Sequence, residues 1–202
     1  MTARFIHLRC HTEYSLLEGA MPLKALVKRA KAAGMPAVAV TDTNNLFAAL
    51  EFAVTALGEG VQPVVGMQIS VAEGPAQPGE RRCPPAPLVL LAQSEAGYMN
   101  LMALNSALYL GAAQGQVTLD DLARYAGGLI CLTGGAEGPV GRHIAAGQMP
   151  KAEAVLNRLR AIYPGRLYVE IQRHPGPDGQ LMEAERATEA GLIDLAYAHD
   201  LP

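Results

Sequence analysis

The sequence predicts an α/β fold in which strands and helices alternate around a parallel sheet or barrel. Short apolar runs rich in valine, isoleucine and leucine recur along the chain, and segments with helical spacing of apolar residues separate them. Glycine, proline and asparagine stand near most of the boundaries, as turn residues do. Such regular alternation is typical of βα units, whose strands run parallel because each crossover passes through a helix.

Six segments are expected to be strands, because each is short and apolar and is bounded by turn residues. They span residues 5–10, 37–41, 63–71, 88–92, 129–133 and 167–172. Polar and charged side chains gather where several of these segments end. In α/β folds the carboxyl ends of the strands are where binding and catalytic sites are usually built, so we expect any functional site there.

Helical spacing predicts the elements between the strands. Pro22 begins the first helix and Gly34 ends it, while Ser94 and Thr118 cap later helices. Further helices are expected over 46–57, after Ser94, over 118–125 and 151–163, and from Leu181 onward. The basic positions of the first helix are consistent with either a solvated face or a contact with DNA.

Length and composition indicate one domain over residues 1–202. Half of the residues are apolar, which is enough for a sizeable core. Residues 73–87 are rich in proline and show little apolar periodicity, so we expect a mobile surface loop inside the domain and not a domain boundary. No apolar run reaches the length of a membrane span.

Charge and cysteine usage narrow the function classes. The net charge of -3 argues against a strong nucleic-acid binder, which usually needs a basic face. Cys10, Cys83 and Cys131 are few, odd in number and not paired as CxxC, which argues against a disulfide framework or a thiolate zinc site. A reducing, cytoplasmic location fits this usage, and the first twenty residues lack the uninterrupted apolar centre of a signal peptide.

The clustered imidazole, hydroxyl and carboxylate groups of residues 5–19 are the first candidate site. His7 and His11 would share one face of a strand but lie about 13 Å apart, so they cannot bind one ion unless the chain bends. They are either metal ligands or hydrogen-bonded structural histidines. Asp42 is a helix cap or a site residue, and His174 either stabilises a turn or acts as a ligand.

Five sequence blocks carry a resemblance to a known family. They are FIHLRCHTEYSLLEGA, PAVAVTDTNNLFAALEFAVTALGEGVQPVVGMQISV, PLVLLAQSEAGYMNLMALNSALYL, GGLICLTGGAEG and LYVEIQRHPGP. In this order they resemble the N-terminal PHP (polymerase and histidinol phosphatase) domain of bacterial DNA polymerase III alpha subunits. The resemblance implies a distorted seven-stranded (β/α) barrel, truncated here before its last strand, in a longer chain that continues into polymerase domains.

Metal-competent PHP domains bind a cluster of divalent ions that activates water against a phosphoester. Among the ligand positions that the resemblance places inside this chain, His11 and Glu18 keep groups that bind metal. The other positions have lost them, at Arg9, Thr43, Gln68, Pro87 and Gly135. Because arginine stays cationic and repels metal ions, we expect no metal, no cofactor and no catalytic residue in this segment.

The remaining polar groups are expected to form a vestigial cleft. Its members are His7, Arg9, His11, Glu18, Asp42 and His174. We expect Arg9 to substitute for the missing metal charge by pairing with Glu18 or Asp42. The motivation is that a cation stands where cations are bound in metal-competent members of the family.

The resemblance implies a PHP module of a replicative DNA polymerase, a DNA-directed nucleotidyltransferase that acts in DNA replication. This segment would be an inactive structural platform for the remaining polymerase domains and for the proofreading exonuclease subunit, among other replicase subunits. DNA and Mg would bind elsewhere in the parent chain.

The alternative is an active phosphoesterase or 3'-5' exonuclease that uses Zn or Mn. Its ligands would be His7, His11, Glu18, Asp42 and His174. A metabolic enzyme similar to histidinol phosphatase is a third hypothesis. Arg9 disfavours it, because such an enzyme should keep the family's HxH pair.

Overall fold

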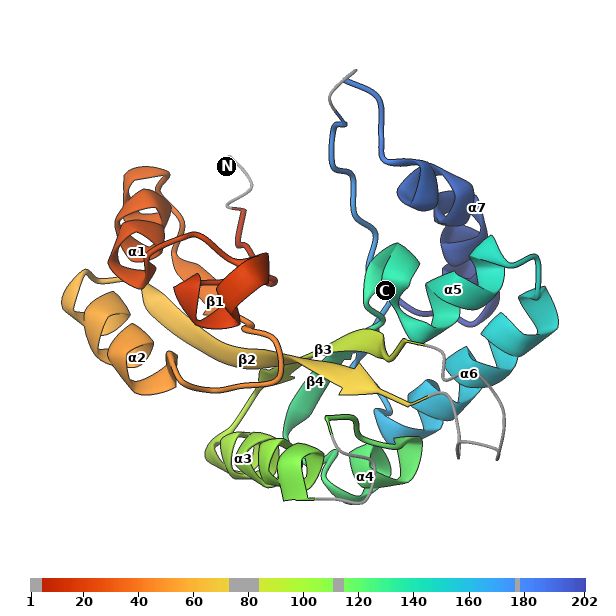
Figure 1. Ribbon diagram of the computed structural model, residues 1–202, viewed down its shortest axis with the longest axis horizontal. Helices are drawn as coiled ribbons and strands as arrows, with labels where there is room; N and C mark the ends of the chain where they lie inside the picture. The colour runs from red at the N-terminus through yellow and green to blue at the C-terminus, as the bar shows by residue number, and fades with distance from the viewer. Residues whose placement is uncertain (1–4, 73–83, 111–114, 177–178) are drawn as a thin grey trace.

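A five-stranded mixed sheet forms the centre of the molecule (Figure 1). The computed structural model describes residues 5–72, 84–110, 115–176 and 179–202. Within these residues the order of the strands in the sheet follows the sequence. The strands are β1 (Ala37–Val40), β2 (Gln62–Val71), β3 (Ala86–Ala92), β4 (Leu129–Leu132) and β5 (Leu167–Tyr168).

The outer strand pairs are parallel and the inner pairs are antiparallel. β1 runs parallel to β2 with Ala37 opposite Gln62, and β4 runs parallel to β5. β3 runs antiparallel to both of its neighbours, with Leu90 opposite Met67 on β2 and Cys131 on β4. A fully parallel sheet is therefore the wrong prediction. No helix is predicted between β2 and β3, and a connection without a crossover helix favours an antiparallel neighbour.

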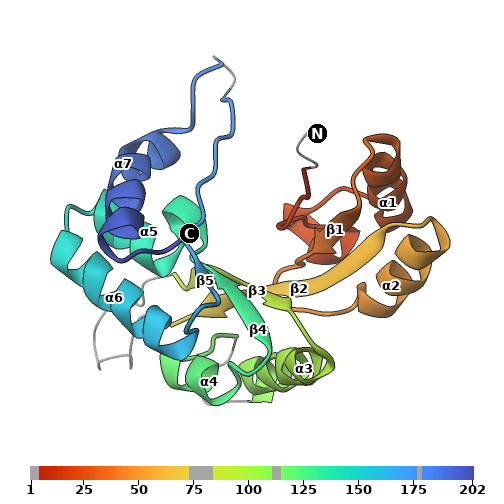
Figure 2. The same ribbon diagram turned by 180° about the vertical axis from the view of Figure 1, so that it is seen from behind.

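Helices cover the sheet at both ends and below its centre, as Figure 1 and, from behind, Figure 2 show. α1 (Leu23–Ala32) and α2 (Ala49–Gly58) lie beside β1 and β2, and α3 (Glu95–Leu110) and α4 (Leu119–Arg124) lie below the middle strands. The other end is formed by α5 (Pro139–Ala145), α6 (Met149–Ile162) and α7 (Glu183–Ala198). Two short 3-10 helices are η1 (Glu13–Glu18) and η2 (Gly135–Glu137). No helix in the described part of the chain is long and apolar enough to cross a membrane.

The hydrophobic core occupies both faces of the central strands. Leu88 and Leu90 of β3 belong to the largest buried cluster, which also takes side chains from α3, α4 and α6. Val89 and Leu91 belong to a small cluster on the opposite face, as the alternation of side chains along a strand requires. A further cluster around Phe52 joins α1 and α2 to β1. Gln68 lies opposite Val89 in the pairing of β2 with β3, so its side chain is on the same face as the small cluster.

Residues 5–10, expected to be a strand, are irregular. The segment still runs beside β1, because Ala39 N donates to His7 O and Thr41 N donates to Cys10 O, both at 2.8 Å. Between these two contacts the N-terminal segment advances by three residues, from His7 to Cys10, while β1 and its continuation advance by two, from Ala39 to Thr41. The N-terminal segment therefore has one extra residue, as in a β-bulge. An extra residue of this kind redirects the side chains around it, and Arg9 lies between the two contacts.

Two further predictions about the strands need correction. Of the predicted strand 167–172, Leu167 and Tyr168 alone pair as β5, and Glu170 N donates instead to the Thr133 side chain at 2.9 Å. The predicted loop 73–87 is shorter, because β3 begins at Ala86; residues 73–83 lie outside the described residues. The described residues form an open five-stranded sheet in place of the seven-stranded barrel that the resemblance implies.

The Tyr163 hydroxyl is buried among apolar side chains of the largest cluster. Within the described residues it has no hydrogen-bond partner. Burial raises the pKa of Tyr163, because the phenolate would lose its hydration. This hydroxyl therefore carries a desolvation cost that no hydrogen bond offsets.

We expect Tyr163→Phe to be neutral or stabilising. Removing an unpaired buried hydroxyl relieves a cost of about 1 kcal/mol or more and keeps the ring that fills the core. The free energy of unfolding, measured by urea titration, should stay level or rise. Tyr163→Ala is the control, which should lose about 3–5 kcal/mol through the cavity it leaves. A clear loss of stability in the phenylalanine variant would contradict this account of the hydroxyl.

Candidate functional site

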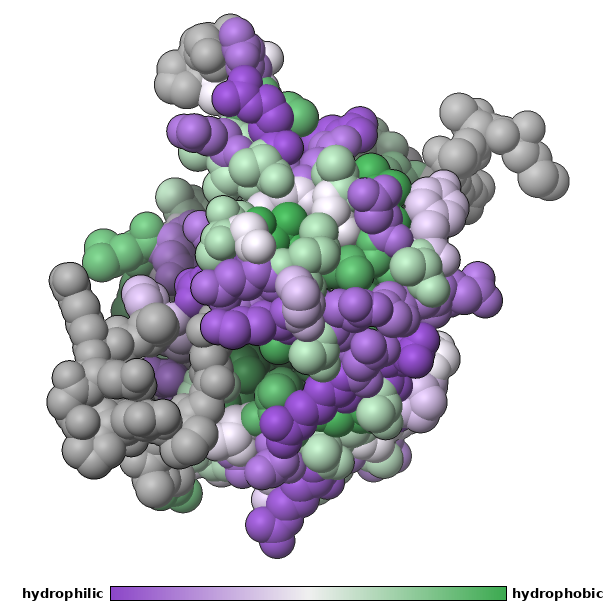
Figure 3. All heavy atoms as spheres, turned by 90° about the vertical axis from the view of Figure 1, so that its right-hand side faces the viewer, coloured by the Kyte–Doolittle hydropathy of each residue, from purple (hydrophilic) through white to green (hydrophobic). Residues whose placement is uncertain are grey.

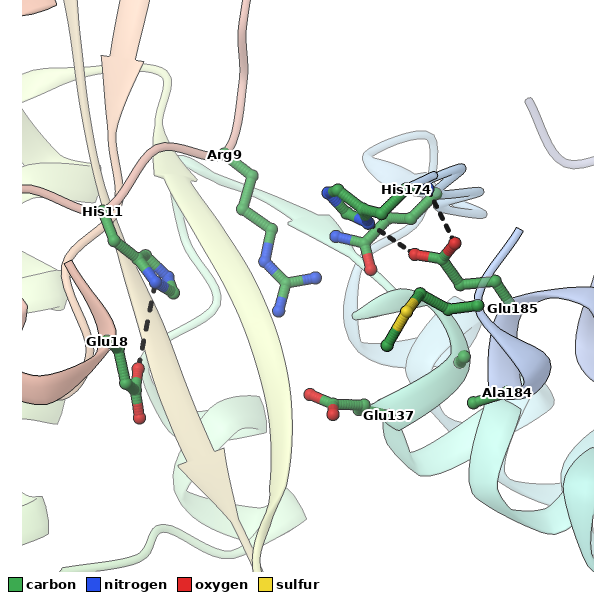
Figure 4. Close-up of a pocket in the computed structure, with 10 residues that line it drawn as sticks. Arg9, His11, Glu18, Glu137, His174, Ala184 and Glu185 are labelled. Carbon is green, nitrogen blue, oxygen red and sulfur yellow. Dashed lines mark hydrogen bonds and ion pairs between the residues drawn. The ribbon is translucent and has the colours of Figure 1, made fainter. Parts of the chain in front are cut away.

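A cavity of about 560 Å³ lies between the N-terminal segment and the end of the molecule that carries α5 and α7 (Figure 4). Its charged and imidazole side chains come from distant parts of the sequence. They are Arg9, His11, Glu18, Glu137, His174 and Glu185. Four of the six residues predicted to form the cleft are therefore brought together, while His7 and Asp42 are not among the residues that line it.

The Arg9 guanidinium connects the two sides of this cavity. Its Nε and Nη2 atoms donate to Gln68 Oε1 at 3.0 and 2.6 Å. Its Nη1 atom donates to Glu170 Oε1 at 3.0 Å and to the Gly134 carbonyl oxygen at 3.5 Å. The Arg9 and Glu170 side chains are only 16% and 11% exposed, so solvent screens this ion pair less than it screens a surface pair.

Gln68 extends this bridge to Glu18. Because its Oε1 atom faces the guanidinium, its Nε2 atom faces Thr43 and donates to Oγ1 at 3.1 Å. Thr43 Oγ1 in turn donates to the Glu18 carboxylate. Gln68 Oε1 can only accept, so His11 Nε2 donates to it at 3.1 Å. The residues at the lost ligand positions 9, 43 and 68 therefore bond to one another.

Glu170 holds Arg9 from the other side, and the sequence analysis missed it. Its Oε2 atom accepts from Gly134 N at 3.1 Å, and its Oε1 atom accepts from Gln172 Nε2 at 3.0 Å. A signal for it was present, because a carboxylate within a predicted apolar strand needs a partner when it is buried. The identity of that partner depends on the tertiary fold. Glu18 and Asp42, which were predicted as the partners of Arg9, were the wrong residues.

Asp42 anchors the turn that leads into η1. Its buried carboxylate accepts from Thr12 N at 2.6 Å, from Thr12 Oγ1 at 2.7 Å and from Ser15 Oγ at 2.6 Å. All of these donors are neutral groups of the N-terminal segment. Asp42 therefore neither caps α2, whose N-cap is Ala48, nor lines the cavity; its carboxylate instead holds residues that lie 27 and 30 positions earlier in the chain.

The three histidines of the predicted cleft have separate surroundings. His7 is exposed, and its ring packs edge-on against Phe5 with the ring centroids 4.8 Å apart. His174 lines the cavity, but its backbone N donates to Glu185 Oε2 at 2.7 Å and its ring pairs with the other carboxylate oxygen. This favours the turn-stabilising interpretation of His174, which ties the segment before α7 to that helix. His11 alone joins the Arg9 network.

Backbone geometry accounts for the glycine at position 135. Gly135 has a φ of +63°, and a Cβ atom there would lie 2.8 Å from Gln172 Oε1. Gln172 therefore fills the space that a ligating side chain would need. The other lost position on this side, Pro87, lies in β3 opposite Ser70.

The described residues do not fit a metal cluster. Among them, no three histidine, cysteine, aspartate or glutamate side chains lie close enough together to hold one ion. His11 Nδ1 and Glu18 Oε2 are 3.8 Å apart. The Arg9 cation lies beside them, because Arg9 and His11 both bond to Gln68 Oε1. Transition-metal sites in proteins usually need three or four good ligands, which this set of described residues does not supply.

Comparison with known proteins identifies the family. Residues 7–174 match the PHP domain. The chain belongs to the PHP family. DNA polymerase III subunit alpha of Caulobacter vibrioides is 42% identical over 201 residues, which are 98% of this chain and 17% of that protein. The same subunit of Escherichia coli is 34% identical over 202 residues, which are 98% of this chain and 16% of that protein. This PHP chain therefore spans about a sixth of the relatives that it matches.

A solved structure shares the fold of this PHP domain. A Bifidobacterium adolescentis protein, named as a metal-dependent phosphoesterase, aligns with a TM-score of 0.54 over 98% of this chain and 85% of that one. The sequences are 12% identical, so the likeness concerns the fold alone. The predicted resemblance to the PHP domain of DNA polymerase III alpha subunits is confirmed by the family match and by the relatives.

We expect Arg9→Ala to destabilise the domain, because Glu170 and Gln68 lose a shared donor in a shielded site. The loss in unfolding free energy should be about 2–4 kcal/mol, measured by urea titration. Adding Glu170→Gln to this variant should recover part of the loss, since no unpaired carboxylate remains. Arg173→Ala, which breaks an exposed pair with Glu189, is the control and should change stability little. An Arg9→Ala variant as stable as the parent would refute the bridge.

The thiol of Cys10, the residue after Arg9, is expected to be alkylated slowly. Burial, and then the charge of Asp42, raise the pKa of Cys10 from 9.0 to about 11. At pH 8 about one thiol in a thousand is then ionised, so alkylation by iodoacetamide, followed by mass spectrometry, should be slow and should accelerate with pH.

The folded state holds the Cys10 proton more tightly than the unfolded state does. The contribution of this thiol to stability is therefore present below pH 9 and is lost between pH 9 and about 11. Rapid labelling of the folded chain at pH 8 would contradict the shift; the urea-unfolded chain is the control.

Proposed function

We propose that this chain is the PHP module of a replicative DNA polymerase III alpha subunit, a DNA-directed DNA polymerase of the cytoplasm, and that the module itself is catalytically inactive. Nucleotidyl transfer, with its Mg ions and its DNA, belongs to other parts of the parent chain. The module stabilises those polymerase domains and is a docking platform for the proofreading exonuclease subunit within the replicase.

The observation that carries this proposal is the position of the Arg9 guanidinium. It stands at a family ligand position and pairs with Gln68 and Glu170 across the cavity. A cation held there by neutral and acidic partners competes with any metal ion for the same place. It also joins the first segment of the chain to the segment after β5, which is an architectural role.

The second candidate is an active metal-dependent phosphoesterase or 3'-5' exonuclease. The fold likeness to the protein named as a metal-dependent phosphoesterase favours it, and so do His11, Glu18 and His174 on the cavity wall. It requires Arg9 to leave its two partners and His174 to leave Glu185. Zn or Mn would then have to gather ligands that the described residues keep apart.

The test of the proposed function is metal content together with partner binding. The full-length parent chain, purified without chelators and dialysed against trace Zn and Mn, should hold less than about a tenth of an ion per PHP site, because two ligands do not retain a cluster. Because carboxylates that bind Mg also bind Mn, Zn is the ion that reports on the PHP site, and Mn content is interpreted only by comparison with the variants below. The same chain should bind the proofreading exonuclease subunit in sedimentation experiments.

Two variants serve as controls for the metal measurement. His11→Ala removes a retained ligand position, and His7→Ala removes an exposed histidine outside the cavity. The proposal expects neither variant to change the metal content. A tightly held ion that is lost in His11→Ala and kept in His7→Ala would establish the phosphoesterase candidate, and single-stranded DNA would then be the first substrate to test.

A further inference from the structure

α2 carries an apolar stripe on its solvent face. Leu50, Val54 and Leu57, with Phe47 in the turn that leads into the helix, are 63–77% exposed. At 100° per residue the three helical side chains fall within an arc of about 60° and along roughly 10 Å of the helix. Isolated exposed leucines are common, whereas large apolar side chains aligned on one helix face form a patch that usually has a partner.

The stripe is not needed for the packing of α2 within the domain. Phe52 and Ala56, on the opposite face of the helix, are fully buried in the cluster that joins α1, α2 and β1. Glu51, which follows Leu50 in the sequence, is held toward the N-terminal segment by the Tyr14 hydroxyl at 3.1 Å and toward α1 by Lys24 at 3.8 Å. The stripe is thus left free of charge.

The opposite end of the molecule has a different surface. Figure 3 shows that hydrophilic residues run across the side over α6 and α7, with hydrophobic residues between them. α2 lies at the other outer edge, beyond β2, in both Figure 1 and Figure 2. The apolar stripe of α2 therefore lies away from that face.

We infer that the α2 stripe is the surface on which the polymerase portion of the parent chain packs. This inference rests on the proposed function. The relatives are about six times as long as this chain, so most of such a protein lies outside the described domain and supplies a partner within the same chain. The spacing of Leu50, Val54 and Leu57 matches the ridge that one helix presents to another, so the expected partner is the apolar face of a helix.

The absence of charge from the stripe favours a partner in the same chain over a separate subunit. Contacts that are never exposed resemble a domain core and are more apolar, whereas surfaces for partners that come and go are more polar. A second copy of the chain or the exonuclease subunit could cover the same residues. These occupants are distinguished by the experiment below.

The test is hydroxyl-radical footprinting of the full-length parent chain, purified alone, with the urea-unfolded chain as the reference for full labelling. We expect labelling of Phe47, Leu50 and Leu57 to fall to background and to be independent of protein concentration. Full labelling would overturn the inference. Protection that appears only at high concentration, or only after the exonuclease subunit is added, would also overturn it and would assign the stripe to a second copy or to that subunit.

A paired substitution tests the same surface by stability. Val54→Lys with Leu57→Lys suits an exposed helix, because lysine is a better helix former than valine and its charge is favourable near the carboxyl end. If the stripe is covered, the melting temperature of the full-length chain should fall by about 5 °C or more. Tyr197→Lys, at an exposed position of α7, is the control and should not shift it. An unchanged melting temperature in the paired variant would contradict the inference.

The inference and the proposed function fail separately. Metal content and exonuclease binding report on the cavity and on the inactive module, and they do not depend on what covers α2. A labelled α2 stripe in a metal-free, exonuclease-binding polymerase would refute the inference alone. A native protein without a polymerase portion would refute the proposed function and the inference with it.

Discussion

A single shielded guanidinium holds the two sides of the cavity together. Arg9 lies in the N-terminal segment, Gln68 in β2 and Glu170 after β5, so one side chain joins three parts of the chain that are far apart in sequence. A metal cluster can make such connections, but only through ligands that the described residues lack. The guanidinium makes them with directional hydrogen bonds to an amide and a carboxylate. Arg9 and Glu170 are therefore held to each other, because losing either one would leave an unpaired, shielded charge that destabilises the fold.

The lost ligand positions depend on one another. Gln68 uses both ends of its amide, accepting from Arg9 and donating to Thr43, and Thr43 passes a hydrogen bond to Glu18. A histidine in place of Thr43 would have to replace both an acceptor and a donor. Gly135 is coupled to Gln172 in another way, because that side chain fills the space beside it. Restoring a family ligand at position 9, 43, 68 or 135 would therefore disturb an existing contact before it created a metal site.

Periodicity predicts the α/β class and most helices and strands, because burial within one element leaves a pattern in its own residues. It does not record the direction of a neighbouring strand, so the antiparallel pairing of β3 was not predictable in this way. The irregular segment before η1 and the partners of Arg9 depend on tertiary contacts. The sequence shows a cation at position 9 and a carboxylate at position 170, but not that the two meet, because that approach depends on how β4 and β5 pair.

β2 connects the cavity to the outer edge of the domain. Val65 packs toward the cluster of α2, whereas Gln68 faces Arg9, as side chains an odd number of residues apart must do along a strand. Arg9 restrains β2 through its hydrogen bonds to Gln68. Anything packed on α2 would restrain the same strand through the cluster that joins Phe52 to Val65. Under the proposed function, these two supports on the same strand are how the module contributes to a polymerase through its shape.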